Sequence, residues 1–166
     1  MRRLLPLLAL ALCSGCAATV YEANGFPFNM DGPQQAPIPE AARTIRVSGT
    51  LFHRLTGMAL RQAVVGNMIF LDPNVILDSG TSHGDGAWFA ADGRTWYWSR
   101  FRLGHGRGSY TIRHDLVCTA GNGDRCFSLF RSADGRFVRH GPRPYAPSLI
   151  MVRPIPADWV PRIQPR

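Results

Sequence analysis

Hydrophobic and polar positions alternate along the centre of the chain, which is the period expected of half-buried β-strands. The stretch TIRVSGTLF alternates until Gly49 interrupts it, and MIFLDPNVIL is an apolar run split by Asp72 and Pro73. SYTIRHDLVC offers a further strand or pair of strands, broken near His114 and Asp115. SLIMV, close to the C-terminus, predicts one more strand at a sheet edge. These runs predict a series of short strands separated by turns.

Two of the β-prone runs are centred on the same tetrapeptide, Ala-Asp-Gly-Arg. AWFAADGRTWYW holds it at 91–94, and CFSLFRSADGRFV holds it at 133–136. Asp-Gly between apolar runs is a strong hairpin signal, because glycine readily takes the positive φ that the turn requires. The flanking residues do not align, which favours convergent turn chemistry over an internal duplication. Asn122-Gly123 predicts a third hairpin, between the last two cysteines.

One segment, LTGMALRQAVVGN, has helical spacing. Thr56 is a plausible N-cap, Leu60 and Val64 are four residues apart, and Gly66-Asn67 supplies a stop. We therefore predict a mainly β domain, an antiparallel meander or small barrel of five to eight short strands, with one short N-terminal helix. The alternation does not decide whether the sheet closes into a barrel.

The first residues depart from this pattern. Arg2 and Arg3 precede an apolar run, and the small residues Ser14 and Gly15 stand directly before Cys16. This is the order of a secretory signal, and the apolar run is far shorter than the roughly 20 residues that cross a bilayer as a helix. Small residues directly before a cysteine resemble the lipobox of bacterial lipoproteins. In that family the signal is cut before the cysteine, whose thiol carries a diacylglycerol.

The match to the lipobox is imperfect, because Cys13 stands where the family usually has leucine. Ordinary signal cleavage nearby and a Cys-x-x-Cys dithiol are the alternatives. The lipoprotein interpretation predicts an exported protein, lipid-anchored in the bacterial cell envelope and facing the periplasm. It divides the chain into four segments: a signal peptide (1–15), a lipidated Cys16 with a flexible tether (16–42), a β-rich domain (43–153) and a Pro/Arg-rich tail (154–166). A flexible tether of that length would reach about 25–30 Å.

The net charge of the chain limits the classes of partner that we expect. All 19 basic residues are arginine, and without Arg2 and Arg3 the remaining 17 face 11 acidic residues, a net charge of about +6. In an envelope the matching anions are lipid phosphates, lipopolysaccharide and acidic wall polymers, and another envelope protein is the alternative partner. Nucleic acid would be the default for so basic a cytosolic domain. Export argues against it, and no RNP, helix-turn-helix or zinc-finger pattern supports it.

Two cysteines, Cys118 and Cys126, remain for the folded domain. An even pair in an exported chain predicts a disulfide, and the hairpin between them would bring them opposite each other. Two free buried thiols are the alternative. The histidines lack the paired spacing of zinc sites, so we expect no metal and no cofactor.

RTWYWSRFR interleaves arginines with aromatic residues, a pattern suited to stacking and anion binding. The candidate ligand surface comprises Arg94, Tyr97, Arg100 and Arg102. The competing interpretation is a plain strand, with Trp96 and Trp98 on one face, in the core, and Tyr97 on the other.

DSGTSHGDGA and GHGRGS combine histidine with small residues, and we interpret both as flexible loops. Ser82, His83 and Asp85 have the residue types of a nucleophile, a base and an orienting group, but no nucleophile elbow surrounds Ser82. The two glutamates, Glu22 and Glu40, fall in the predicted tether. We therefore assign no catalytic residue.

Two family resemblances bear on function. The order Gly66-Asn67, FAADG, GSYTI, LVC and RCFSLF resembles a group of small exported bacterial domains of unknown function, over about residues 55–140. It implies a small β-rich fold and carries no catalytic residues. SADGRFV is similar to the Ser-Ala-Ser-Gly loop of bacterial lipoprotein inhibitors of C-type lysozyme, with Asp134 in place of the second serine. That loop enters the enzyme's cleft, but such lysozymes are usually strongly basic and would repel a basic inhibitor.

The sequence thus predicts a non-catalytic envelope lipoprotein with a binding or structural role. Two alternatives stay open. A hydrolase acting on an envelope polymer would require His83, Asp85 and a third polar group to converge in one pocket. A lysozyme-inhibitor-like protein would require Ser132 to Gly135 to project as an exposed, rigid loop.

Overall fold

The computed structural model describes residues 20–23, 41–71, 77–78, 81–82, 85–99, 102–121, 125–141, 147–155 and 157. These contain thirteen strands and one helix, α1 (Gly57–Val64). The strands are β1 (Val20–Ala23), β2 (Thr44–Val47), β3 (Thr50–Arg54), β4 (Asn67–Phe70), β5 (Leu77–Asp78), β6 (Thr81–Ser82), β7 (Gly86–Phe89), β8 (Arg94–Ser99), β9 (Arg102–Arg113), β10 (Leu116–Ala120), β11 (Arg125–Ser132), β12 (Phe137–His140) and β13 (Ser148–Pro154).

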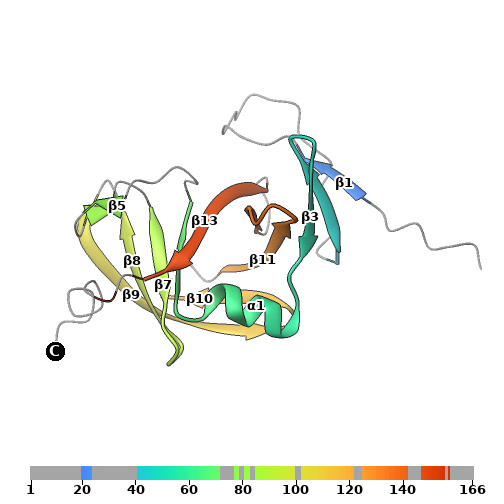
Figure 1. Ribbon diagram of the computed structural model, residues 1–166. Helices are drawn as coiled ribbons and strands as arrows, with labels where there is room; N and C mark the ends of the chain where they lie inside the picture. Colours follow the sequence, from blue (N-terminus) through green and yellow to red (C-terminus); the bar gives the residue numbers. More distant parts are fainter. Residues whose placement is uncertain are drawn as a thin grey trace, which may run out of the picture.

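Eight of the strands close into an antiparallel barrel (Figure 1). Their order is β11-β10-β9-β8-β7-β4-β13-β12, and β12 pairs back onto β11 to close the circle. Closure leaves the barrel sheet without a free edge. The predicted fold class, a mainly β antiparallel small barrel with one short helix, is confirmed. SLIMV, predicted as an edge strand, instead lies inside the sheet as β13, between β12 and β4.

Strands β3, β2 and β1 extend the sheet beside the barrel (Figure 1). This is possible because β11 is long, so that its first part pairs with β10 and its last part pairs with β3. TIRVSGTLF forms a hairpin rather than one strand, since Ser48 and Gly49 both take positive φ between β2 and β3. Strand β1 runs parallel to β2. It lies inside the segment 16–42 that we expected to be a tether; residues 24–40 of that segment, the predicted signal and Cys16 lie outside the described residues.

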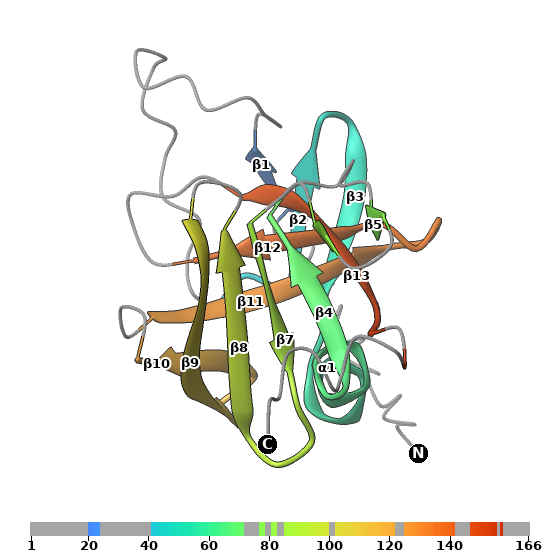
Figure 2. The same ribbon diagram turned by 90° about the vertical axis from the view of Figure 1, so that its left-hand side faces the viewer.

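Alternation along the strands separates the two faces of the barrel wall. One set of buried side chains forms the interior core: Leu60, Val64, Ile69, Ala87, Phe89, Tyr110, Val117, Phe127, Leu129 and Ile150. Leu60 and Val64 come from α1, so the helix packs against the interior from the lower side of the barrel as drawn in Figures 1 and 2. A second buried cluster lies on the opposite face of β4, β7 and β8, and contains Met68, Phe70, Trp88, Ala90 and Trp96.

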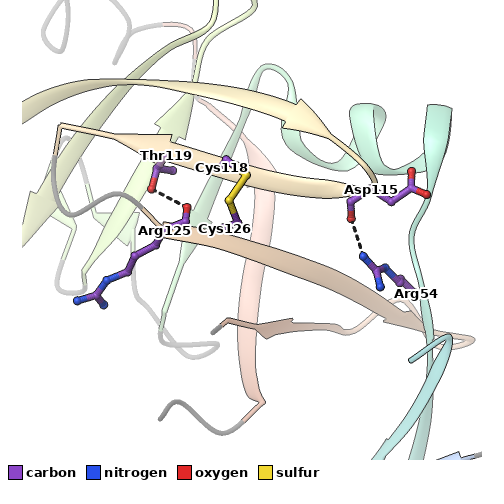
Figure 3. The surroundings of a disulfide bond; sticks show 6 residues. All are labelled: Arg54, Asp115, Cys118, Thr119, Arg125 and Cys126. Atoms are coloured by element: carbon purple, nitrogen blue, oxygen red, sulfur yellow. Dashed lines mark hydrogen bonds between the residues drawn. A yellow bond between two sulfur atoms is a disulfide. The ribbon is translucent and has the colours of Figure 1, made fainter. Parts of the chain in front are cut away.

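The helix is fixed by a residue far away in the sequence. Thr56 occupies the predicted N-cap position but makes no capping hydrogen bond with its side chain. Instead the Gly57 N–H donates to Asp115 Oδ1 at 2.8 Å, and Arg54 Nη2 donates to the Asp115 carbonyl oxygen at 3.1 Å (Figure 3). Asp115 lies in the turn between β9 and β10, where it and His114 take positive φ, as a two-residue hairpin turn requires. The prediction of a break at this pair is confirmed.

The segment GHGRGS, expected to be a flexible loop, is part of strand β9. Gly106 and Gly108 pack closely against the neighbouring strands. Gly106 pairs with Tyr97 and Gly108 with Thr95 across to β8. A Cβ on Gly108 would overlap the Ala120 carbonyl oxygen and would lie 3.0 Å from Tyr97 Cε2. Part of the other expected loop, DSGTSHGDGA, forms the short pair β5 and β6.

Candidate functional site

The predicted disulfide between Cys118 and Cys126 is present (Figure 3). The two residues are direct partners across β10 and β11, and their Cα atoms are 3.9 Å apart. Beside them, Thr119 Oγ1 donates to the Arg125 carbonyl oxygen at 3.3 Å. The bond joins the two strands of the third predicted hairpin, whose tip, at 122–124, lies outside the described residues.

The structure describes the side chains of two of the four residues predicted as a ligand surface, Arg94 and Tyr97, and these point to opposite faces of β8. Arg94 is exposed and forms an ion pair with Asp92, whose pKa is lowered mainly by the hydrogen bond from the Arg94 side chain. The Arg94 guanidinium also lies 5.2 Å from the centroid of the Trp96 ring. Tyr97 faces the other way, packs against the interior core and has a buried hydroxyl group. Arg100 and the side chain of Arg102 lie outside the description.

The burial of Trp96 agrees with the competing interpretation of this strand. Trp96 is 3% exposed and contacts Trp88, with ring centroids 5.0 Å apart. Tyr97 lies on the opposite face of β8, as the strand period requires. The side chain of Trp98 lies outside the described residues.

The residues considered for catalysis are only partly described. Ser82 ends β6 and Asp85 directly precedes β7, whereas His83 lies outside the description. Within the described ranges, no group of three or more His, Cys, Asp or Glu side chains is placed to hold a metal ion. Nor does any helix in those ranges have the length and hydrophobicity needed to span a bilayer.

A surface hollow of about 240 Å³ lies between α1 and the barrel strands β12, β13 and β4. Ala59, Gln62 and Ala63 line it from the helix. Its other apolar lining comes from residues of the loop before α1 and of the barrel, namely Leu55, Phe137, Val152 and Pro154. Arg131 and Arg153 also line it, and both are exposed.

The hollow stays open beside α1 because the helix residues on that side include two alanines. Leu60 and Val64 enter the interior core, and both are fully buried. Ala59 and Ala63 precede them by one position, so they form the adjoining stripe of the helix surface. A methyl group at each of these positions leaves a gap that a leucine would fill. Asn67 Nδ2 donates to the Gln62 carbonyl oxygen at 2.9 Å and ties the end of the helix to β4.

The hollow is electropositive. Arg131 and Phe137 are direct partners across β11 and β12, and the Arg131 guanidinium lies 5.4 Å from the centroid of the Phe137 ring. Arg153, on β13, also lines the hollow. Among the described residues that line the hollow, Arg131 and Arg153 are the charged ones, so its lining has a net positive charge. The arrangement can pair an anionic group with the arginines while an apolar group contacts Phe137 and Val152.

None of these residues was predicted as a site. Arg131 and Arg153 are 22 residues apart in a chain with many arginines, and no local motif links them. The pair of alanines next to Leu60 and Val64 was the one available signal of a second, less filled helix face.

The Ser132–Arg136 turn was the loop expected to project in an inhibitor. Ala133, Asp134 and Arg136 are exposed, while Ser132 is buried. Ser132 Oγ accepts a hydrogen bond from the Arg136 N–H at 3.0 Å and bonds to the Asp134 carboxylate. The turn is therefore exposed at its tip and fixed at its base.

Comparison of the chain with protein-family models, with curated proteins and with solved structures gives no match.

Proposed function

We propose that this protein is a non-catalytic lipoprotein of the bacterial cell envelope that binds an anionic envelope component. The observation that carries the proposal is the hollow beside α1, where Arg131 and Arg153 border an apolar lining without a described carboxylate. The net charge of about +6 after removal of the signal agrees in sign with such a ligand.

The filled interior of the barrel supports binding at its surface. Eight-stranded barrels have interiors just wide enough to be filled by side chains or to hold one small ligand. Phe89, Phe127 and Leu129 all belong to the interior core and are at most 3% exposed. The hollow adjoins this core, because four of its lining residues pack against it, namely Leu55, Ala63, Phe137 and Val152.

The position of β1 supports an anchored domain that stays close to the membrane. Val20 begins a paired strand only four residues after Cys16, and four residues span at most about 14 Å. This is about half the reach of the flexible tether that the sequence suggested. A lipid on Cys16 would therefore hold the basic domain near the anionic headgroups.

The lysozyme-inhibitor alternative has one observation in its favour, the exposed and internally bonded Ser132–Arg136 turn. The same turn form recurs at 90–94, so the shape follows from Ala-Asp-Gly-Arg itself. The charge of the domain still opposes this alternative. The hydrolase alternative depends on His83, which lies outside the described residues.

Fractionation of cells that express the full chain tests the anchor. The wild-type protein and a Cys13→Ala variant should both sediment with envelope membranes, because Cys13 precedes the cleavage site. A Cys16→Ala variant should lose the lipid and appear in the soluble fraction or keep its signal. If Cys16→Ala sediments and is processed like the wild type, lipid anchoring through Cys16 is wrong.

A further inference from the structure

We infer that the hollow beside α1 binds a single-chain anionic amphiphile, an alkyl chain that carries a phosphate or carboxylate head. This inference rests on the proposed function, since it names the ligand class of the same hollow. It follows from the two kinds of surface that meet there. The arginines can pair with an anion, and the apolar lining next to them can contact a hydrocarbon.

Arg131 and Arg153 would hold the head. Arginine suits phosphate and carboxylate because its planar fork donates two parallel hydrogen bonds. The Arg131 side chain rests on the Phe137 ring at 5.4 Å from its centroid, which orients the guanidinium before a ligand arrives. Both arginines are exposed, so water competes and each should contribute a modest factor in affinity.

The apolar lining would hold the first part of the chain. Leu55, Phe137 and Val152 face the hollow, and Ala59 and Ala63 keep it open on the helix side. Its volume of about 240 Å³ is below the roughly 300–1,000 Å³ of sites that enclose a whole drug-sized ligand. The hollow therefore fits the headgroup and the adjoining methylenes, while the rest of the chain stays outside.

A purely polar anion or a neutral lipid fits less well. Inorganic phosphate would satisfy the arginines but leave the apolar lining in contact with water. A long-chain alcohol would cover that lining but pair with neither guanidinium. An amphiphilic anion uses both surfaces, and each further methylene buried should raise affinity about fourfold.

The test is calorimetric titration of the detergent-free full chain carrying Cys16→Ser, so that no attached lipid competes for the hollow. The probes are decyl phosphate, decanol and inorganic phosphate, each below the concentration at which it forms micelles. Decyl phosphate should bind at least tenfold more tightly than either of the others. Equal binding of decyl phosphate and inorganic phosphate, or no binding of decyl phosphate, would overturn the inference.

Variants locate the binding. Arg131→Gln and Arg153→Gln should each weaken decyl phosphate binding about threefold to tenfold, whereas Arg107→Gln, an exposed arginine on β9, should leave it unchanged. Ala59→Phe should obstruct the hollow and abolish binding without altering any charge. Circular dichroism confirms that each variant is folded. If Ala59→Phe binds like the parent, the ligand does not occupy this hollow and the inference is wrong.

Phosphatidylglycerol vesicles test the alternative of a two-chain membrane lipid. Sedimentation with vesicles that is lost in Ala59→Phe would mean that the hollow takes a headgroup presented by a membrane, and would overturn the single-chain class. Sedimentation that is unaffected, together with loss of decyl phosphate binding, indicates a free amphiphile. The anchoring test and the decyl phosphate test can fail independently of each other. A chain that Cys16 anchors but that ignores decyl phosphate overturns only the ligand class, and a chain that binds it without being anchored overturns only the location.

Discussion

The two Ala-Asp-Gly-Arg turns have the same sequence and the same backbone, but different parts of the barrel hold them. Gly93 and Gly135 have φ of +84° and +86°. In each turn the glycine N–H donates to the carbonyl three residues earlier at 3.1 Å. In each, too, the arginine pairs with the aspartate two residues before it. The tetrapeptide therefore specifies the turn by itself.

What differs is the support around each turn. The turn between β7 and β8 is held from outside by Tyr110, whose hydroxyl donates to the Ala90 carbonyl oxygen and whose N–H donates to the Gly93 carbonyl oxygen, both at 2.8 Å. The turn between β11 and β12 supplies its own support through Ser132. It also contacts β3, where Arg136 Nη2 donates to Thr50 Oγ1 at 2.8 Å and the Arg136 guanidinium lies 6.0 Å from the centroid of the Phe52 ring.

This difference shows that the local sequence determines the shape of a turn but not the contacts that hold the turn in the fold. A turn that depends on four adjacent residues can be predicted, but its attachment to the barrel cannot, because Tyr110 and Thr50 are distant along the chain. The turn between β7 and β8 is bonded to the neighbouring barrel strand β9, whereas the turn between β11 and β12 contacts β3, which lies beside the barrel.

The largest expected effect comes from removing the outside support of the first turn. Tyr110→Leu loses the hydrogen bond to Ala90 and the edge-to-face contact with Phe89, whose ring centroid is 5.1 Å away. It should lower the free energy of unfolding by about 2–3 kcal/mol. Tyr110→Phe, which keeps the ring, should cost about 1 kcal/mol. Urea denaturation measures both, and equal costs would mean that the ring adds nothing to the support.

A smaller effect is expected at the second turn. Ser132→Ala removes a buried hydroxyl that accepts from the Arg136 N–H and bonds to Asp134, and it should cost about 1–2 kcal/mol. Thr50→Val, which removes only the exposed contact with Arg136, should cost less than about 0.5 kcal/mol. The same denaturation experiment checks them. A larger cost for Thr50→Val would mean that β3, rather than Ser132, holds this turn.

The smallest expected effect is on the pH dependence of the free energy of unfolding. The pKa of Asp92 is lowered mainly by Arg94, whereas the pKa of Asp134 is lowered first by Ser132. A carboxyl with a lowered pKa binds fewer protons in the folded state, so its contribution to stability is present above its ordinary pKa of 3.8 and is lost as the pH falls below that value.

Ser132→Ala should therefore raise the pKa of Asp134 toward 3.8 and leave that of Asp92 unchanged. Titration of the two carboxyl groups by NMR measures both values. A shift of Asp92 as large as that of Asp134 would contradict the separate support of the two turns.

Prediction from sequence succeeded where the signal was local. The helix, both Asp-Gly turns and the break at His114-Asp115 follow from neighbouring residues, and the Cys118–Cys126 bond follows from a hairpin of eight residues' separation. The closure of the barrel depends on pairings between distant segments, such as β13 with β4 and β12 with β13. Alternation alone cannot specify these pairings.

The helix cap and the hollow could not be predicted for the same reason. Asp115 caps α1 from 58 residues away, and Arg131 lines the same hollow as Ala59 and Ala63 although it lies on a distant strand, β11. The segment with Gly106 and Gly108 was wrongly predicted as a loop, because Gly108 lies too close to the Ala120 carbonyl oxygen and the Tyr97 ring, on the neighbouring strands β10 and β8, to carry a Cβ. In each case the deciding contact joins residues that the sequence keeps apart.

The most direct test of the central claim, a disulfide-bonded barrel anchored in the envelope by a lipid, is the intact mass of the protein purified from envelope membranes. It is measured before and after reduction. The account predicts a chain that begins at Cys16, carries the added mass of lipid, and gains two protons on reduction as the Cys118–Cys126 bond opens. An unprocessed chain without lipid and with four free thiols would contradict it, and would reopen the dithiol of Cys13 and Cys16.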